Sequence, residues 1–137
     1  MSGKEQDFIK EAFDTNWVVP LGPNVNAFEK SLQDFLIENG KLKIENEGKQ
    51  VVALSAGTAA LHLGLILLGV QAGDEVICQS FTFCASANPV TYLGATAVFV
   101  DSEEDTWNMN PVLLEEAIRD RIAKTGREPK AIIPVHL

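Results

Sequence analysis

Three consecutive segments decide the fold: Val51-Val-Ala-Leu54, Ser55-Ala-Gly-Thr58 and Ala59-Ala-Leu-His-Leu-Gly-Leu-Ile-Leu-Leu68. The first segment is a short β-rich run, and the last is apolar on nearly every side, as in a helix buried between a sheet and its neighbours. The four residues between them form a small turn around Gly57. A strand that passes through a tight turn into a buried helix is typical of a βαβ unit, so we predict an α/β fold.

The same alternation of β-rich and helical runs continues along the chain. The predicted strands are Glu75–Cys78, Thr96–Asp101 and Ala131–Val135, and the predicted helices are Ala85–Leu93 and Val112–Lys124. Pro89 is expected to kink the first of these helices or to delay its start, and Pro111 introduces the second. The alternation predicts a mostly parallel sheet with crossover helices.

The first 50 residues have a different pattern. Asn24–Glu38 is predicted to be an amphipathic helix, and Glu38–Gln50 is polar and charged, as in an exposed connection. We therefore divide the chain into an N-terminal segment, 1–50, and the first part of an α/β domain, 51–137. Leu137 follows the last predicted strand closely, whereas ligands of open α/β sheets bind in loops beyond the carboxyl ends of the strands. We expect the α/β domain to be incomplete.

Composition and charge argue against several classes of partner. The 137 residues carry a formal net charge of -8 and show no basic stripe, so no nucleic-acid or anionic-membrane surface is expected. Met1–Lys10 lacks the apolar run of a signal peptide, and the most hydrophobic stretch, Ala59–Val70, is too short to span a membrane. We predict a cytoplasmic protein. Cys78 and Cys84 are predicted to be buried thiols. A disulfide framework and a zinc site are not expected, because the chain has no second cysteine pair and no nearby histidines at metal spacing.

The turn Ser55–Thr58 is the first candidate binding site. Gly57 lets backbone approach a ligand closely, and the helix that begins there offers free N–H groups and the positive end of its dipole to an anion. Thr58 would add a hydroxyl donor. Alternatively, Ser55 simply caps the helix. The sequence contains neither Gly-x4-Gly-Lys-Ser/Thr nor Gly-x-Gly-x2-Gly, so nucleotide-phosphate and dinucleotide sites have no specific support.

Residues at the predicted strand ends are further candidates. In Ser80-Phe-Thr-Phe83 a ring could cover a flat cofactor, although the pattern alone is explained more simply by two core phenylalanines. His136 would point toward the same crevice, or serve only as a structural hydrogen-bonding group. His62 is predicted to be a core histidine with a hydrogen-bond partner. Asp101 could face the crevice or turn the chain.

In their order and spacing, these segments resemble the DegT/DnrJ/EryC1/StrS family, a branch of the fold-type I pyridoxal phosphate enzymes. Most members are aminotransferases that act on nucleotide-linked keto-sugars. The resemblance covers nearly all of the chain, and each motif is weak by itself. The matching motifs are Trp17, Gly22-Pro-Asn-Val25, Phe28-Glu29, Ala56-Gly-Thr-Ala-Ala-Leu-His62, Gly73-Asp-Glu-Val-Ile77, Thr82-Phe-Cys-Ala85, Gly94-Ala-Thr-Ala-Val-Phe-Val-Asp101 and Ile132-Ile-Pro-Val-His-Leu137.

The resemblance implies a fold, a cofactor and site residues. The fold would be the N-terminal part of the large domain of an aspartate aminotransferase-like transferase, and the cofactor pyridoxal 5'-phosphate. Gly57 and Thr58 match the turn that holds the cofactor phosphate, and Phe83 matches the aromatic residue that stacks on the pyridine ring. Trp17 falls in a segment that shapes the substrate side near a dimer interface, and His136 lies near the site without a fixed catalytic role. The implied partners are a nucleotide sugar, an amino-acid donor and a second subunit of a homodimer.

Two functional groups of the family have no match in these residues. The acid that faces the pyridine nitrogen and the lysine that forms the Schiff base both fall beyond Leu137, so we predict no transaminase activity from residues 1–137 alone. Alternatives are a sugar dehydratase of the same family, in which histidine replaces the lysine, and a non-catalytic α/β module that binds phosphate or a small molecule. The family fold also implies that Val51–Leu54 lacks its flanking strands here.

Overall fold

The computed structural model describes residues 2–40 and 51–137. The chain divides into two compact units, the first up to Ala53 and the second from Leu54 to Leu137. Most of the predicted connection Glu38–Gln50 lies outside the described residues.

The second unit is built on a three-stranded parallel sheet in the order β2-β1-β3. The strands are β1 (Glu75–Gln79), β2 (Thr96–Val100) and β3 (Ala131–Ile133). Ile77 at the centre of β1 stands opposite Val98 on one side and Ile132 on the other. The predicted parallel sheet with crossover helices is therefore confirmed.

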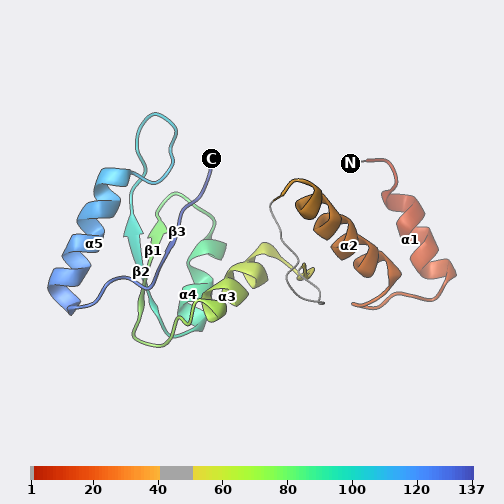
Figure 1. The fold of residues 1–137 in the computed structure, drawn as a ribbon, viewed down its shortest axis with the longest axis horizontal. Helices are drawn as coiled ribbons and strands as arrows, with labels where there is room; N and C mark the ends of the chain where they lie inside the picture. The colour runs from red at the N-terminus through yellow and green to blue at the C-terminus, as the bar shows by residue number, and fades with distance from the viewer. Residues whose placement is uncertain (1, 41–50) are drawn as a thin grey trace. The chain divides into compact units, whose positions relative to one another are not determined.

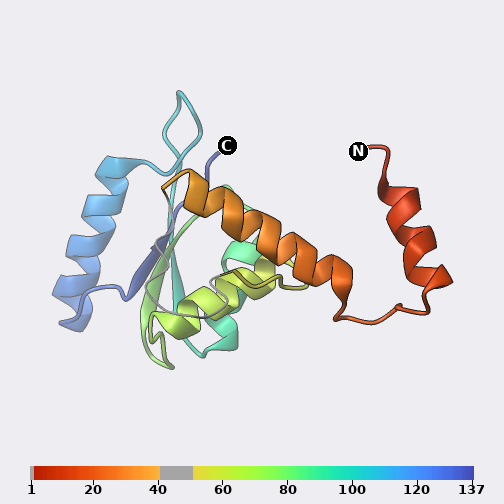
Figure 2. The same ribbon diagram turned by 45° about the vertical axis from the view of Figure 1, so that its right-hand side comes forward.

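Helices cover both faces of this sheet. The elements are α3 (Gly57–Leu67), the 3-10 turn η1 (Cys84–Ser86), α4 (Asn88–Tyr92) and α5 (Pro111–Thr125). Figures 1 and 2 show α5 on one face and α3 and α4 on the other. Helix α5 begins where the Asn110 side chain accepts hydrogen bonds from the N–H groups of Val112 and Leu113, and it ends at Gly126, whose φ of 71° is left-handed. Pro89 delays the start of α4, as the sequence predicts.

The core lies around β1. Val76, Ile77, Cys78 and Gln79 have no exposed surface, and Val90 of α4 is equally buried. A central strand that is covered on both faces is typical of a parallel sheet between helices. The run of buried residues on β1 therefore holds the sheet in place and carries the residues that follow it, from Ser80 on, to the surface.

Charged groups close the amino end of the sheet. The Arg121 guanidinium donates two hydrogen bonds to the Glu75 carboxylate, at 2.9 and 2.7 Å, and both side chains are largely buried. Lys130 N–H donates to the Glu75 carbonyl at 2.7 Å, and Arg127 donates to the Gly73 carbonyl at 2.9 Å. These contacts join the start of β1 to α5 and to the segment that enters β3.

The predicted strand Val51–Leu54 does not form. These residues belong to no ladder in the described part of the chain, which agrees with the expectation that this segment lacks its partners. An extended segment becomes a strand only when another strand satisfies its N–H and C=O groups. The last strand is also shorter than predicted, because its pairing with β1 ends at Ile133 rather than Val135.

The first unit contains two described helices, α1 (Glu5–Asp14) and α2 (Pro23–Glu38). Helix α2 confirms the predicted amphipathic helix, whereas α1 was not expected from the sequence. Glu29 of α2 is buried, and its carboxylate accepts a hydrogen bond from Ala53 N–H at 3.0 Å. Large apolar side chains such as Phe13 and Phe28 remain exposed in this unit. None of the described helices combines the length and the apolar character that a membrane span requires.

Candidate functional site

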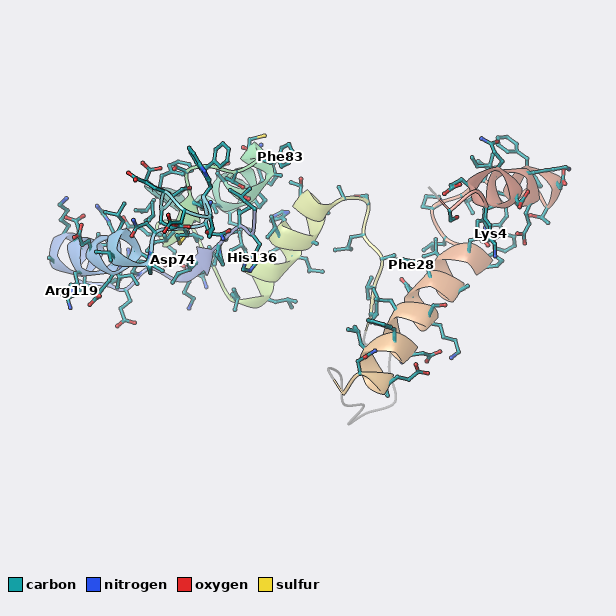
Figure 3. The ribbon with its side chains drawn as sticks, turned by 90° about the horizontal axis from the view of Figure 1, so that it is seen from above. Lys4, Phe28, Asp74, Phe83, Arg119 and His136 are labelled. Carbon is teal, nitrogen blue, oxygen red and sulfur yellow. The ribbon has the colours of Figure 1, made fainter. Side chains whose placement is uncertain are left out.

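Two segments that follow strands of the sheet form the walls of a cavity of about 500 Å³. The segment after β1 contributes one wall, and the segment after β3 contributes the other. Phe83 and His136 therefore line one cavity, as the sequence predicts, and Figure 3 labels both residues in the second unit. The lining residues are Phe81, Thr82, Phe83, Val135, His136 and Leu137.

The two phenylalanines after β1 are surface residues. Phe83 is 85% exposed and Phe81 is 55% exposed, so the interpretation of both as core residues is wrong. The Phe81 ring lies 5.7 Å from the ring of Trp107. The Phe83 backbone is extended, and its carbonyl accepts the first hydrogen bond of η1 from Ser86 N–H at 2.9 Å. The start of η1 thus fixes the backbone of Phe83 while its ring stays open to a ligand.

The turn before α3 leaves donors open at the helix start. The helix begins at Gly57, and the N–H groups of Ala59 and Ala60 both donate to the Ala56 carbonyl. The N–H groups of Gly57 and Thr58 donate to no acceptor among the described residues. No side chain caps the helix, so the interpretation of Ser55 as a simple cap is wrong. A Cβ atom placed on Gly57 would meet nothing within 4 Å, and the turn is therefore open to an anion.

The structure does not place Gly57 and Thr58 among the residues that line the Phe83 cavity. The two features are connected through η1, because α3 packs against η1 and η1 begins one residue after Phe83. The predicted phosphate turn and the predicted stacking ring therefore stand on elements that contact each other.

Trp17 lies in the first unit. Its indole Nε1 donates to the Leu21 carbonyl at 2.6 Å, and a Cβ atom on Gly22 would stand only 2.0 Å from that nitrogen. The indole closes a short turn between α1 and α2, and it borders a cavity of about 300 Å³ that is lined by residues of this unit alone. The role of Trp17 on the substrate side stays a prediction.

The other titratable candidates have local roles. His62 is half-buried rather than core, and its ring meets Tyr92 edge-on with centroids 5.5 Å apart. His136 is exposed at the cavity. Asp101 accepts hydrogen bonds from Ser102 N–H at 2.9 Å and from the Ser80 hydroxyl at 3.0 Å, which lowers the pKa of its carboxyl group. Asp101 therefore turns the chain after β2.

The two cysteines differ from each other. Cys78 is buried in β1, and burial raises the pKa of its thiol to about 11. Cys84 is exposed, which corrects the prediction of two buried thiols. The correction has the same cause as that for Phe83, since both residues lie where the chain leaves the sheet.

Gln79 is a site residue that the sequence analysis missed. Its side chain is fully buried and hydrogen-bonded to three residues in two segments beyond the strands. No local pattern points to it, because these partners lie 23 to 56 residues further along the chain.

The sequence pattern of the DegT/DnrJ/EryC1/StrS aminotransferase family matches residues 1–137, the whole chain. The chain belongs to this family. The resemblance inferred from the motifs is confirmed.

Curated relatives within the family match the chain over all of its length. EpsN of Bacillus subtilis (strain 168), whose assignment as a pyridoxal phosphate-dependent aminotransferase is provisional, is 51% identical over 100% of this chain and 32% of its own length. GDP-perosamine synthase of Caulobacter vibrioides is 40% identical over the same shares. The chain thus spans about a third of the length of these relatives.

Solved structures of the family confirm the fold. A DegT DnrJ EryC1 StrS aminotransferase from Brucella abortus matches with a TM-score of 0.78 and 38% identity, over 96% of this chain and 32% of the other. The protein ntda from Bacillus subtilis, solved with bound cofactor pmp, matches with a TM-score of 0.69 and 30% identity, over 100% of this chain and 28% of the other. The predicted α/β class, as part of a pyridoxal phosphate-dependent aminotransferase domain, is therefore confirmed.

Proposed function

We propose that this chain provides part of the coenzyme site of a pyridoxal phosphate-dependent aminotransferase that acts on a nucleotide-linked keto-sugar. In this proposal the turn at Gly57 and Thr58 binds the coenzyme phosphate, and Phe83 covers the pyridine ring. The observation that carries the proposal is the helix start at Gly57, which has two open N–H donors and no side-chain cap.

The chemistry of this turn fits a phosphate group. The first N–H groups of α3 point out of the helix, and the helix dipole places partial positive charge at the same end. The missing Cβ of Gly57 leaves room for a phosphate oxygen to approach the backbone, and the Thr58 hydroxyl is a further possible donor. These residues bind and orient the anion and take no part in proton transfer.

Phe83 fits the ring of the coenzyme. Its side chain is the most exposed of the large apolar residues in the described part of the chain, and it lines a cavity with apolar neighbours. An aromatic face stacks favourably on a flat heterocycle and excludes water from that side. When bound, pyridoxal phosphate supplies the electron sink that amino transfer requires. Phe83 holds the ring in one plane.

The substrate side of the proposal is supported by the relatives. One of them is named as a GDP-perosamine synthase, which favours a nucleotide-linked sugar as substrate. A keto-sugar as acceptor and an amino acid as amino donor are part of the same proposal. Trp17 and His136 are the proposed substrate-side residues. A homodimer and a cytoplasmic location belong to the same proposal. No lysine among residues 1–137 matches the family's catalytic motif, so coenzyme binding is the proper readout for these residues.

The test replaces Gly57 by aspartate or by asparagine, two residues of nearly the same size that differ in charge. Pyridoxal phosphate is titrated into the full natural polypeptide and into its Gly57→Asp and Gly57→Asn variants, and binding is followed by absorbance and fluorescence. A carboxylate at the helix start repels the phosphate, so Gly57→Asp is expected to weaken binding at least about tenfold relative to Gly57→Asn.

Thermal stability separates this effect from a folding defect. An acidic residue in the first turn of a helix is favourable, so without coenzyme Gly57→Asp is expected to unfold at the same temperature as the unchanged protein or slightly above it. Equal coenzyme affinity in the Asp and Asn variants would show that the phosphate binds elsewhere.

A further inference from the structure

The amide of Gln79 connects the end of β1 to two other segments at the carboxyl end of the sheet. Its Nε2 donates to the Trp107 carbonyl at 2.8 Å and to the Ser102 hydroxyl at 3.3 Å, while its Oε1 accepts from Val135 N–H at 3.2 Å. The partners fix the orientation of the amide, because a carbonyl can only accept and a backbone N–H can only donate.

The segments held by Gln79 are the loop 102–109 and residues 135–137. Residues 102–109 form a loop closed by an antiparallel bridge between Ser102 and Met109. A second contact joins this loop to the segment after β3, since Leu137 N–H donates to Asn108 Oδ1 at 3.1 Å. Gln79 and Asn108 therefore hold the backbone of residues 135–137 from two sides.

These contacts set the geometry of the Phe83 cavity. Val135 and Leu137, whose N–H groups are held, line the wall opposite Phe81 and Phe83. Trp107, whose carbonyl is held, has the left-handed φ of 62° that is uncommon outside glycine, and its ring lies against Phe81. The amide thus restrains one wall directly and the other through Trp107.

We propose that Gln79 is a positioning residue that sets the width of the coenzyme cavity by holding residues 135–137 and the loop 102–109 at fixed places. This inference rests on the proposed coenzyme site. A purely structural role would be filled more simply by an apolar side chain, since the neighbouring residues of β1 are buried and apolar. A buried amide is retained without penalty only when its donors and acceptor are all satisfied, as they are here.

The experiment compares Gln79→Met with Val90→Ala in the full natural polypeptide. Methionine has nearly the shape of glutamine but keeps none of the three hydrogen bonds. Val90 is fully buried in α4 and contributes no group to the cavity, so Val90→Ala is the control for a general loss of stability. Both variants are measured at a temperature where thermal unfolding shows each to be fully folded.

The first readout is hydrogen exchange of peptides that cover residues 102–109 and 134–137. Gln79→Met is expected to speed exchange in both segments at least about tenfold, because the Val135 amide loses its acceptor and the loop loses its anchor. Val90→Ala is expected to leave the ratio of exchange between these segments and β1 unchanged. Equal effects of the two variants would overturn the inference.

The second readout is the affinity for pyridoxal phosphate, together with the visible circular dichroism of the bound coenzyme. Gln79→Met is expected to weaken binding about tenfold and to change the dichroic band, whereas Val90→Ala changes neither. If the unchanged protein does not bind the coenzyme, the proposed function fails, while hydrogen exchange still decides whether Gln79 holds the two segments.

Gln79→Glu gives a graded comparison, and it replaces Gln79→Met if that variant does not fold. Its carboxylate can still accept from Val135 N–H but cannot donate to the Trp107 carbonyl when ionised. Exchange at neutral pH is therefore expected to increase in residues 102–109 and to stay slow at Val135. Unchanged exchange in the loop would contradict the role assigned to the amide.

Discussion

The two ends of the three-stranded sheet are built from different chemistry. At the amino end, Glu75 and Arg121 are largely buried and joined by two hydrogen bonds, and further polar contacts close the strands. At the carboxyl end, Phe83 is exposed over a cavity, and α3 begins with open donors at Gly57. One end has its polar groups paired within the unit, and the other leaves groups available to a ligand.

This difference indicates that stability and ligand binding can be altered separately in this protein. Ligands of open α/β sheets bind beyond the carboxyl ends of the strands, so the amino end is free to be closed by permanent contacts. Substitutions at the amino end should change unfolding and leave coenzyme binding intact. Substitutions of exposed residues at the carboxyl end, such as Phe83, should do the reverse.

The two cysteines give the largest expected contrast between the interior of the sheet and its carboxyl end. Cys84 is exposed and should react with a thiol reagent in the native state, whereas Cys78 must wait for the sheet to open. Labelling of Cys78 is expected to be about a thousandfold slower or more, measured by mass spectrometry of the peptides that contain Cys78 and Cys84. Similar native-state rates would show that the interior of the sheet is accessible.

The Cys78 thiol also predicts an alkaline loss of stability. Burial raises its pKa to about 11 in the folded protein, above the ordinary cysteine value of about 8.5. The folded state therefore keeps the proton longer than the unfolded state, and stability is expected to fall as the pH rises from about 8.5 through 11. Melting temperatures measured across this range should fall less steeply in Cys78→Ala than in Cys84→Ser.

Glu75→Gln should cause the next largest change, at the amino end. The amide removes the nearer of the two carboxylates that pair with the Arg121 guanidinium and leaves only Asp120, at 3.5 Å, so the melting temperature is expected to fall. In the double variant Glu75→Gln, Arg121→Met the melting temperature should fall by less than the sum of the falls in the two single variants, because the double variant leaves neither partner's charge unpaired. Coenzyme affinity is expected to stay the same in all three, and a parallel loss of affinity would mean that the two ends are coupled.

Phe83→Ala should give the smallest change, and at the opposite end. Loss of ring stacking is expected to weaken pyridoxal phosphate binding about three- to tenfold. The melting temperature should hardly move, since the Phe83 side chain is 85% exposed and contributes little to the core. Phe83→Tyr is the matched control and is expected to keep most of the affinity. A clear drop in stability for Phe83→Ala would place its ring in the packing of the unit.

The helices and strands that could be predicted from the sequence are those that a local pattern of apolar residues, prolines and caps specifies. The strands β1 and β2 and the helices α2 and α5 have apolar periodicity, prolines and caps that specify them within a few residues. Val51–Leu54 has the composition of a strand, but a strand also needs a neighbour, and composition does not supply one. Helix α1 was missed even though Phe8, Ala12 and Phe13 stand at helical spacing and could have indicated it.

The site residues divide in the same way. Gly57 begins a helix because the turn and the apolar run around it are local, and this start was predicted. The exposure of Phe81, Phe83 and Cys84 was not readable from the pattern, because apolar residues are buried only where other elements cover them. The role of Gln79 could not be predicted from any local pattern. Its three partners come from distant parts of the chain, and only the folded sheet brings them to its amide.

The contact between the Trp17 indole and the Leu21 carbonyl has a practical consequence for spectroscopy. The sequence has two tryptophans, and they fall one in each compact unit, Trp17 in the first and Trp107 in the second. Replacing either one by phenylalanine leaves, among residues 1–137, a single tryptophan whose emission wavelength reports on one of the two units. Melting of the helical pair and melting of the sheet can thus be followed as separate fluorescence signals, without attaching any dye.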